Sequence, residues 1–211
     1  MHSTLTVTTP AESFALTRVD TVKAELGIAG TAEDSQIDAY IWQASSAITG
    51  YLGRVIAQEI VSEQFRLPRE LACRTGIEQL VLSRYPVVSI DSVEVDGIAL
   101  DEANYEVDRQ TGLLTRLCSD SPTPWRGRKI TVAYTGGYIS LPELPDAIER
   151  ACINLVKAYR SAATRDPLIR SESVDGVLST TYWVGSTPGG SGGLPPDVTA
   201  LLDPYRDVAL G

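Results

Sequence analysis

The sequence predicts an α+β protein in which a small helical bundle carries an inserted antiparallel β subdomain. Apolar residues recur at helical spacing near both ends of the chain, and between these regions the spacing changes to alternation. Strands enclosed by helices in this way are typical of α+β folds and not of alternating βαβ sheets. We therefore expect about three main helices, a short C-terminal helix and one β insertion.

Residues 16–57 are predicted to form the N-terminal helices of the bundle. Each helix begins with the spacing of a capping box and ends at a glycine: Thr17 with Asp20 and then Gly27, followed by Thr31 with Asp34 and then Gly53. The longer helix has one apolar stripe, which comprises Ile37, Tyr40, Ile41, Ala44, Ile48, Tyr51 and Leu52. We expect Trp42 on this helix to be partly buried.

Residues 58–140 are predicted to form the β insertion. Its strands are indicated by alternating or short apolar runs at Val61 to Leu67, Leu80 to Leu82, Val88 to Val95, Tyr105 to Val107, Leu113 to Leu117 and Ile130 to Tyr134. In the third run, Val88, Ile90, Val93 and Val95 are the expected apolar positions, and Asp96-Gly97 is a strong hairpin-turn signal. Core packing is favoured for Trp125.

Residues 141–168 return to helical spacing and complete the bundle. Pro145 suits the first position of this helix, and Asp166-Pro167 closes it, because a residue before proline avoids the helical region. Cys152 lies on its apolar stripe with Ile148, Ala151, Leu155 and Tyr159, so we expect this thiol to pack in the core.

Residues 169–211 are predicted to be a C-terminal extension. A glycine-rich stretch over 185–193 has the composition of a flexible linker, and a short apolar helix follows between Pro195 and Pro204. Such a helix has little core of its own, so it should dock either on its own body or on a neighbour.

Charge and residue usage exclude several classes of function. The 211 residues carry a net charge of −9, spread evenly along the chain, which argues against wrapping nucleic acid. The single histidine, His2, lies in a terminal segment that we expect to be frayed, and the three cysteines lack CxxC spacing. Glu94, Asp96, Asp101 and Glu102 do not match a calcium loop, so a solvated turn is favoured. No catalytic residue, metal or cofactor is expected, and no apolar run is long enough to cross a bilayer.

The order of short motifs resembles a known family. The motifs are YLGR at 51–54, RYPVVSI at 84–90, VEVDG at 93–97, YEVD at 105–108, GLL at 112–114, VAYTGGY at 132–138, DP at 166–167, SE at 171–172 and PYR at 204–206. This layout resembles the head–tail connector, or adaptor, proteins of tailed bacteriophages and of gene transfer agents, in their longer form with a β insertion. The resemblance covers most of residues 16–207 and lies in the order of the motifs.

The resemblance implies a structural protein without chemistry. Such adaptors form a ring, commonly of twelve copies, beneath the portal protein, and they extend the DNA channel and dock stopper or tail proteins. DNA would pass without sequence-specific binding, and the protein would reside in the particle after assembly in the host cytoplasm. The C-terminal segment typically reaches the portal, which makes Tyr182, Trp183, Val198, Leu201, Leu202, Tyr205 and Arg206 the candidate interface residues.

Two other readings remain open. The chain could be a monomeric module whose β insertion binds a peptide or a sugar, or an enzyme that uses carboxylates alone. In an adaptor, residues 185–206 are expected to be mobile in the free chain and ordered only in an assembly. Deletion of residues 186–211 should then leave the domain folded.

Overall fold

The computed structural model describes residues 2–139, 141–163, 171–174, 178–181 and 193–206. The chain forms two compact units, and each contains two stretches of sequence. Unit 1 comprises Met1–Ser13 and Val55–Ile139, and unit 2 comprises Phe14–Arg54 and Ser140–Gly211. Strands dominate the first unit and helices the second, so the fold is α+β, as the sequence predicts.

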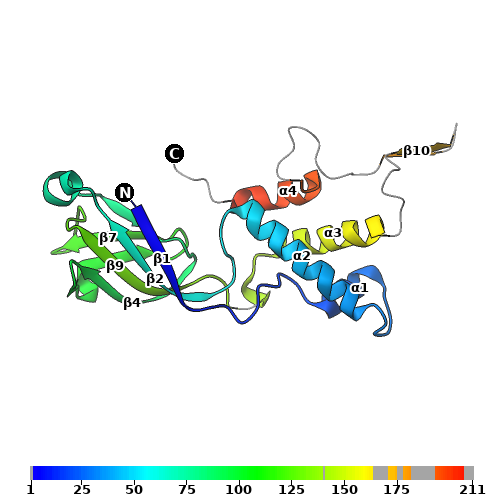
Figure 1. Cartoon of the computed structure of the whole chain (residues 1–211), viewed down its shortest axis with the longest axis horizontal. Coiled ribbons are helices and arrows are strands. Elements are labelled where there is room, and N and C mark those ends of the chain that lie inside the picture. Colours follow the sequence, from blue (N-terminus) through cyan, green and yellow to red (C-terminus); the bar gives the residue numbers. More distant parts are fainter. Residues whose placement is uncertain (1, 140, 164–170, 175–177, 182–192, 207–211) are drawn as a thin grey trace. The chain divides into compact units, whose positions relative to one another are not determined.

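Unit 1 is built on a five-stranded antiparallel sheet with the order β1-β2-β9-β4-β5 (Figure 1). Its strands are β1 (His2–Thr9), β2 (Glu59–Arg66), β9 (Lys129–Gly136), β4 (Val87–Val95) and β5 (Ile98–Ala99). Burial alternates along β2 and β9, because one face of each strand lies on the core.

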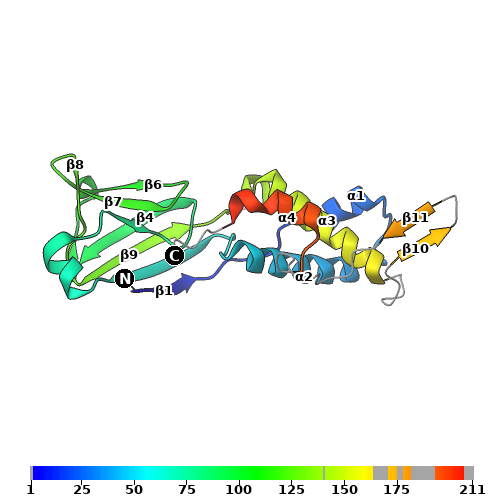
Figure 2. The same ribbon diagram turned by 90° about the horizontal axis from the view of Figure 1, so that it is seen from above.

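A second, four-stranded sheet completes the core of unit 1 (Figure 2). It consists of β3 (Gln79–Val81), β7 (Leu113–Cys118), β6 (Tyr105–Asp108) and β8 (Ser121–Thr123), accompanied by the helical turns η1 (Leu71–Thr75) and η2 (Glu102–Asn104). Both sheets contribute to one apolar cluster that contains Phe65, Leu114 and Trp125. Trp125 is fully buried, as predicted, and its Nε1–H donates to the carbonyl of Leu114 at 3.1 Å.

The predicted hairpin turn at Asp96-Gly97 is confirmed. Both residues have positive φ, 52° and 83°, which suits a tight two-residue turn between β4 and β5. The Asp96 carboxylate accepts from the backbone N–H groups of Arg128 and Lys129, at 2.9 Å each. This carboxylate therefore ties the β4–β5 turn to the start of β9.

The prediction of which β4 side chains face the core is wrong at the start of the strand. Val88 is exposed and Val87 is buried, the reverse of the alternation expected from the sequence. The ladder between β4 and β9 shifts register twice, between Val87 and Ser89 and between Ile90 and Ser92. Each shift inserts a residue, and an inserted residue moves the following side chains to the other face of the sheet.

The N-terminal segment is not frayed, contrary to expectation. Residues His2 to Thr9 form β1, which pairs antiparallel with β2 along nearly its whole length. Most of its side chains are exposed on both faces, so the segment has no apolar alternation by which the sequence could reveal a strand.

Unit 2 consists of helices whose apolar stripes face one another. They are α1 (Val19–Leu26), α2 (Asp34–Leu52), α3 (Asp146–Ala163) and α4 (Pro196–Leu202), with the turns η3 (Leu141–Glu143) and η4 (Asp203–Tyr205) and the hairpin of β10 (Ser171–Val174) and β11 (Leu178–Thr181). The predicted stripe of α2 is buried at Ile37, Ile41, Ala44, Ile48 and Leu52, and that of α3 at Ile148, Ala151, Cys152 and Leu155. Trp42 is more exposed than expected, at 47% of its surface. The predicted stop at Asp166-Pro167 lies outside the described residues.

The predicted helix ends are confirmed at the glycines and wrong at the caps. Gly27 and Gly53 adopt the left-handed conformation after α1 and α2, with φ of 65° and 72°. Neither helix has a side-chain cap: α1 begins after Arg18 and α2 after Glu33. Thr17 instead donates its hydroxyl to Glu149 on α3, at 3.0 Å. The Thr17 hydroxyl, which the sequence pattern predicted would cap α1, thus makes a tertiary hydrogen bond to α3 instead.

Candidate functional site

The C-terminal candidate residues divide according to their burial. Val198 and Leu202 are fully buried, Leu201 and Tyr205 are half-buried, and Arg206 is exposed. Tyr182 and Trp183 lie outside the described residues. The described candidates are therefore brought together on one short segment, which turns two side chains into unit 2 and leaves three at its surface.

Helix α4 is held on its own unit by apolar and polar contacts. It lies alongside α3 (Figure 2), and it places Val198 and Leu202 in the core of unit 2. At its end, Tyr51 of α2 donates its hydroxyl to the Asp203 carboxylate at 2.5 Å, and the Arg206 guanidinium lies 5.2 Å from the centre of the Tyr51 ring. The sequence left open whether this helix docks on its own body, and in the structure it does. The expectation that the segment is ordered only in an assembly is therefore wrong for α4.

A buried polar network in unit 1 was not anticipated from the sequence. Glu63 of β2 is inaccessible to solvent, and its carboxylate accepts from the Ser83 backbone N–H at 2.9 Å, the Ser83 hydroxyl at 2.6 Å and the Tyr134 hydroxyl at 2.9 Å. The Tyr134 hydroxyl in turn accepts from the backbone N–H of Arg84 at 3.0 Å. Burial, followed by the charge of Glu63, holds the pKa of Tyr134 far above its ordinary value.

The same network includes a buried ion pair. Arg84 Nε donates to Glu59 Oε2 at 2.7 Å, and both side chains are largely covered. The Gly136 Cα approaches the same segment closely, since a side-chain carbon there would lie 2.4 Å from the Arg84 carbonyl oxygen. Together these contacts hold the residues between β3 and β4 against β2 and β9. The buried network therefore has a structural role. In the sequence, the network is indicated only by Glu59 and Glu63, two acidic residues at inward positions of β2.

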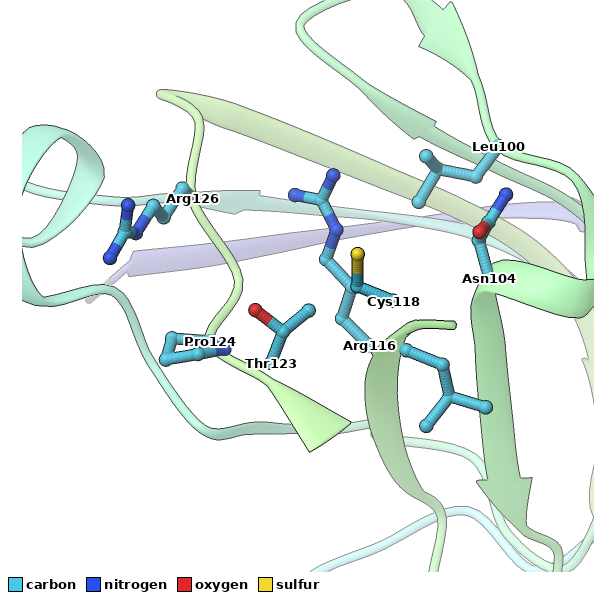
Figure 3. A pocket seen from close by; sticks show the side chains of 8 residues that line it. Leu100, Asn104, Arg116, Cys118, Thr123, Pro124 and Arg126 are labelled. Carbon is cyan, nitrogen blue, oxygen red and sulfur yellow. The ribbon is translucent and has the colours of Figure 1, made fainter. Parts of the chain in front are cut away.

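A small cavity of about 360 Å³ opens in unit 1 (Figure 3). It is lined by Leu100, Asn104, Arg116, Leu117, Cys118, Thr123, Pro124 and Arg126. Figure 3 shows Arg116 and Cys118 at its centre, between Leu100 and Asn104 on one side and Thr123, Pro124 and Arg126 on the other. Two guanidinium groups and one hydroxyl suit an anionic group, but the lining offers no base beside a nucleophile.

The described residues contain no cluster suited to metal binding and no helix suited to a membrane. Among them, no group of three or more His, Cys, Asp and Glu side chains is placed to hold an ion, and no helix is both long and apolar enough to span a bilayer. His2 is exposed on β1, where its ring meets the Thr4 hydroxyl at 3.3 Å. Burial raises the pKa of Cys152 to about 12, so this thiol stays protonated in the core.

Comparison with solved structures identifies the same architecture in particle necks. The chain is similar to a protein in the neck of an empty GTA particle computed with C6 symmetry, with 16% identity, a TM-score of 0.56 and coverage of 99% of this chain and 97% of that chain. It is also similar to one in the neck of a native GTA particle computed with C12 symmetry, with 18% identity, a TM-score of 0.55 and the same coverage, 99% and 97%. A third, from the virion of a native gene transfer agent (GTA) particle, has 18% identity, a TM-score of 0.56 and coverage of 98% and 97%. At these identities the likeness establishes the fold.

Comparison with family models identifies the family. No curated protein matches the chain. The model of the head completion protein family matches residues 15–208, from just before α1 to just after η4, and thus includes most of both units, without strand β1. With both units included in one match, the chain belongs to the head completion protein family.

Proposed function

We propose that the protein is a structural head–tail connector that assembles as a ring beneath the portal of a phage or phage-like particle. The ring extends the DNA channel and presents a platform on which stopper or tail proteins dock. The observation that carries the proposal is the family match over residues 15–208. The likeness to proteins in particle necks reconstructed with C6 and C12 symmetry supports a ring of identical copies, commonly twelve.

The proposed function requires no chemistry from the chain. The described residues offer a buried network, a buried thiol and a small cavity. In the network the Ser83 hydroxyl donates to the Glu63 carboxylate at 2.6 Å, but Glu63 is inaccessible to solvent, and the lining of the cavity places no base beside a nucleophile. The net charge of −9 would let duplex DNA pass without adhering, because like charges repel at short range. The protein would work in the particle and reach it from the host cytoplasm.

The C-terminal segment is proposed to contact the portal or a neighbouring copy. Leu201, Tyr205 and Arg206 lie at the surface of unit 2 and are available for this contact. Val198 and Leu202 would act indirectly, since their burial holds α4 in place. Tyr182 and Trp183 remain candidates on the basis of the sequence alone.

The test is to find the protein in purified particles and to remove its gene. We expect several copies per particle at the neck, measured by quantitative mass spectrometry, and DNA-filled heads without tails when the gene is deleted. Normal tailed particles from the deletion strain would contradict the proposal. A protein that stays monomeric, is absent from particles and binds a peptide or sugar at the Figure 3 cavity would support the alternative binding module.

A further inference from the structure

Unit 1 gathers positive charge at one end of its larger sheet. We define the basic end as Arg66, Arg69, Arg74, Arg126, Arg128 and Lys129, of which all but the half-buried Lys129 are exposed. They come from two segments that lie together: Arg66 pairs with Lys129 across β2 and β9, and the Leu67 N–H donates to the Arg128 carbonyl at 3.1 Å. Six cations from distant parts of the sequence thus share one end of the sheet.

The six cations of the basic end have no acidic partner in the part of the chain that the structure describes. Over the described ranges, no acidic side chain lies within 4.0 Å of any charged group of the basic end. Two exposed acids belong to the same end: Asp96, whose carboxylate is engaged by the backbone N–H groups of Arg128 and Lys129, and Glu70, which follows Arg69 in the chain. The basic end is therefore a local excess of positive charge on a chain with a net charge of −9.

Four cations of unit 2 have acidic partners. Lys23 pairs with Asp34 at 2.7 Å, Arg160 pairs with Glu33 at 3.1 Å, and Arg150 and Lys157 share Glu25 at 2.9 and 3.2 Å. Other cations, such as Arg18 and Arg109, also lack an ion pair among the described residues, but they lie singly. The basic end instead gathers six cations at one place, and this concentration of charge favours an anionic partner outside the unit.

The same unit carries a complementary surface. We define the acidic edge as Asp101, Glu102, Glu106 and Asp108, all exposed. Asp101 caps η2, Glu102 begins it, and the other two lie on β6 at the margin of the second sheet. None of the four has a cationic side chain within 4.0 Å among the described residues. Burial, and then the charges of Glu102 and Asp101, raise the pKa of Tyr105, which lies among them. Two cations lie nearby: the exposed Arg109 follows Asp108 in the chain, and the half-buried Arg116 pairs with Tyr105 across β6 and β7.

We propose that the basic end of one copy contacts the acidic edge of the next copy. Copies that each carry −9 repel one another, so an assembly needs local attraction between complementary patches. Because the two patches lie on different elements of one unit, the contact joins unlike surfaces. Repetition of such a head-to-tail contact generates a ring when the rotation closes. The inference rests on the proposed function, and it names the surfaces that would build the ring.

Charge reversal with rescue tests the contact in the particle-producing host. One variant combines Arg69→Glu with Arg126→Glu, a second combines Glu102→Arg with Glu106→Arg, and a third carries all four changes. The chosen acids spare Asp101 and Asp108, whose carboxylates bond backbone N–H groups of their own turns. Arg18→Glu with Asp38→Arg, both exposed on unit 2, is the matched control. Circular dichroism of each purified variant verifies that it folds.

The readout is the number of copies of the protein per purified particle. We expect each paired reversal to lower it about tenfold or more, because like charges then meet in the contact. The fourfold variant should recover most of the loss, and the control should match the wild type. A copy number in the fourfold variant that exceeds the copy number of either paired reversal supports the contact.

Three results would overturn the proposal. The first is a normal copy number in both paired reversals, and the second is a fourfold variant no better than the worse pair. The third is loss of binding to short duplex DNA in Arg69→Glu/Arg126→Glu with normal copy number, which would make the basic end a DNA-contact surface. In all three the wild type is still present in particles, so the proposed function stands. Absence of the wild type from particles would instead overturn the function itself, and the contact with it.

Discussion

Tyr134 illustrates how single residues fix the β unit. Its hydroxyl donates to a carboxylate that has no access to solvent and accepts from a backbone N–H of the segment that leads into β4. A buried carboxylate is stable only when its lone pairs are satisfied. The ring therefore supplies core packing, and its hydroxyl supplies one of the three hydrogen bonds that the buried Glu63 carboxylate accepts.

We predict that Tyr134→Phe lowers the free energy of unfolding by about 1–3 kcal/mol, the cost of leaving buried polar groups without a partner. Chemical denaturation of purified protein measures this change. Tyr40→Phe is the matched control, because the Tyr40 hydroxyl makes only an exposed bond with Gln36, and we expect a change within about 0.5 kcal/mol. Equal effects of the two substitutions would show that the network adds nothing to stability.

Cys152 provides a second test at this scale. Its pKa is raised to about 12, mainly by burial, whereas Cys73 and Cys118 are exposed. The thiolate is the reactive form, so native protein at mildly alkaline pH should label quickly at Cys73 and Cys118 and at Cys152 only after unfolding. Because the folded state retains the proton, the contribution of Cys152 to stability is complete below the ordinary thiol pKa and declines as the pH rises toward 12. Rapid native labelling of Cys152, detected by peptide mass spectrometry, would contradict its place in the core.

Side-chain type predicted burial better than it predicted local bonding. Trp125 and Cys152 were expected in the core and are fully buried, because large apolar or thiol side chains have few stable alternatives. The two threonine caps failed, since a hydroxyl can bond any nearby acceptor and Thr17 finds Glu149 through the tertiary fold. The partner of a small polar group depends on three-dimensional proximity, which a local pattern does not contain.

At the scale of elements, α4 changes what a C-terminal truncation should do. The sequence predicts that residues 186–211 are dispensable for folding, but α4 buries Val198 and Leu202 on unit 2. We predict that Leu202→Ala lowers the stability of unit 2 by about 2–5 kcal/mol, through lost burial and the cavity left behind. Thermal unfolding measures the loss, and Leu201→Ala, at a half-buried position of the same helix, should cost clearly less. If the two variants unfold alike, or the truncated protein is as stable as the full chain, then α4 contributes no core.

The strands show which patterns survive in the fold. The alternation in β2 and β9 predicted their inward faces correctly, because both are central strands with regular ladders. The start of β4 was assigned to the wrong face, because its bulges break the period of two. β1 was missed because an edge strand with two exposed faces needs no apolar alternation. The alternation of apolar residues thus reveals strands that border the core. Strands that are exposed on both faces, such as β1, are defined only by their hydrogen bonds.

At the scale of the whole molecule, the two units have separate cores. The apolar cluster of unit 1 is drawn wholly from Val61 to Tyr134, and the buried stripes of α2 and α3 belong to unit 2. The succession of helix, strand and helix patterns could be predicted from the sequence. The spatial gathering of cations at one end of unit 1 could not, because residues 1–57, 58–140 and 141–211 each carry a net charge of −3 and only strand pairing brings Arg66 beside Lys129.

We predict that Ile41→Asp unfolds unit 2 and leaves unit 1 protected. An unpaired charge in the helical core costs several kcal/mol, whereas the ladders of β2 and β9 lie on a different core. Hydrogen exchange followed by mass spectrometry should show rapid exchange in α2 and α3 and slow exchange in β9. Gln43→Asp, exposed on the same helix, introduces the same charge and should leave both units protected. Loss of protection throughout the chain would mean that the units fold as one.

The route of the chain through unit 1 makes that unit portable. Thr9 pairs with Ile60, so the segments that end at Ser13 and begin at Val55 leave the sheet at the same side. The backbones of Ile56 and Gln58 both bond that of Tyr138, so the chain enters and leaves the insertion at one place. Two ligations, 13 to 55 and 54 to 140, would turn one polypeptide into two uninterrupted ones, a sheet protein and a helical protein. Removal of the β module at these two junctions would leave every helix of unit 2 uninterrupted.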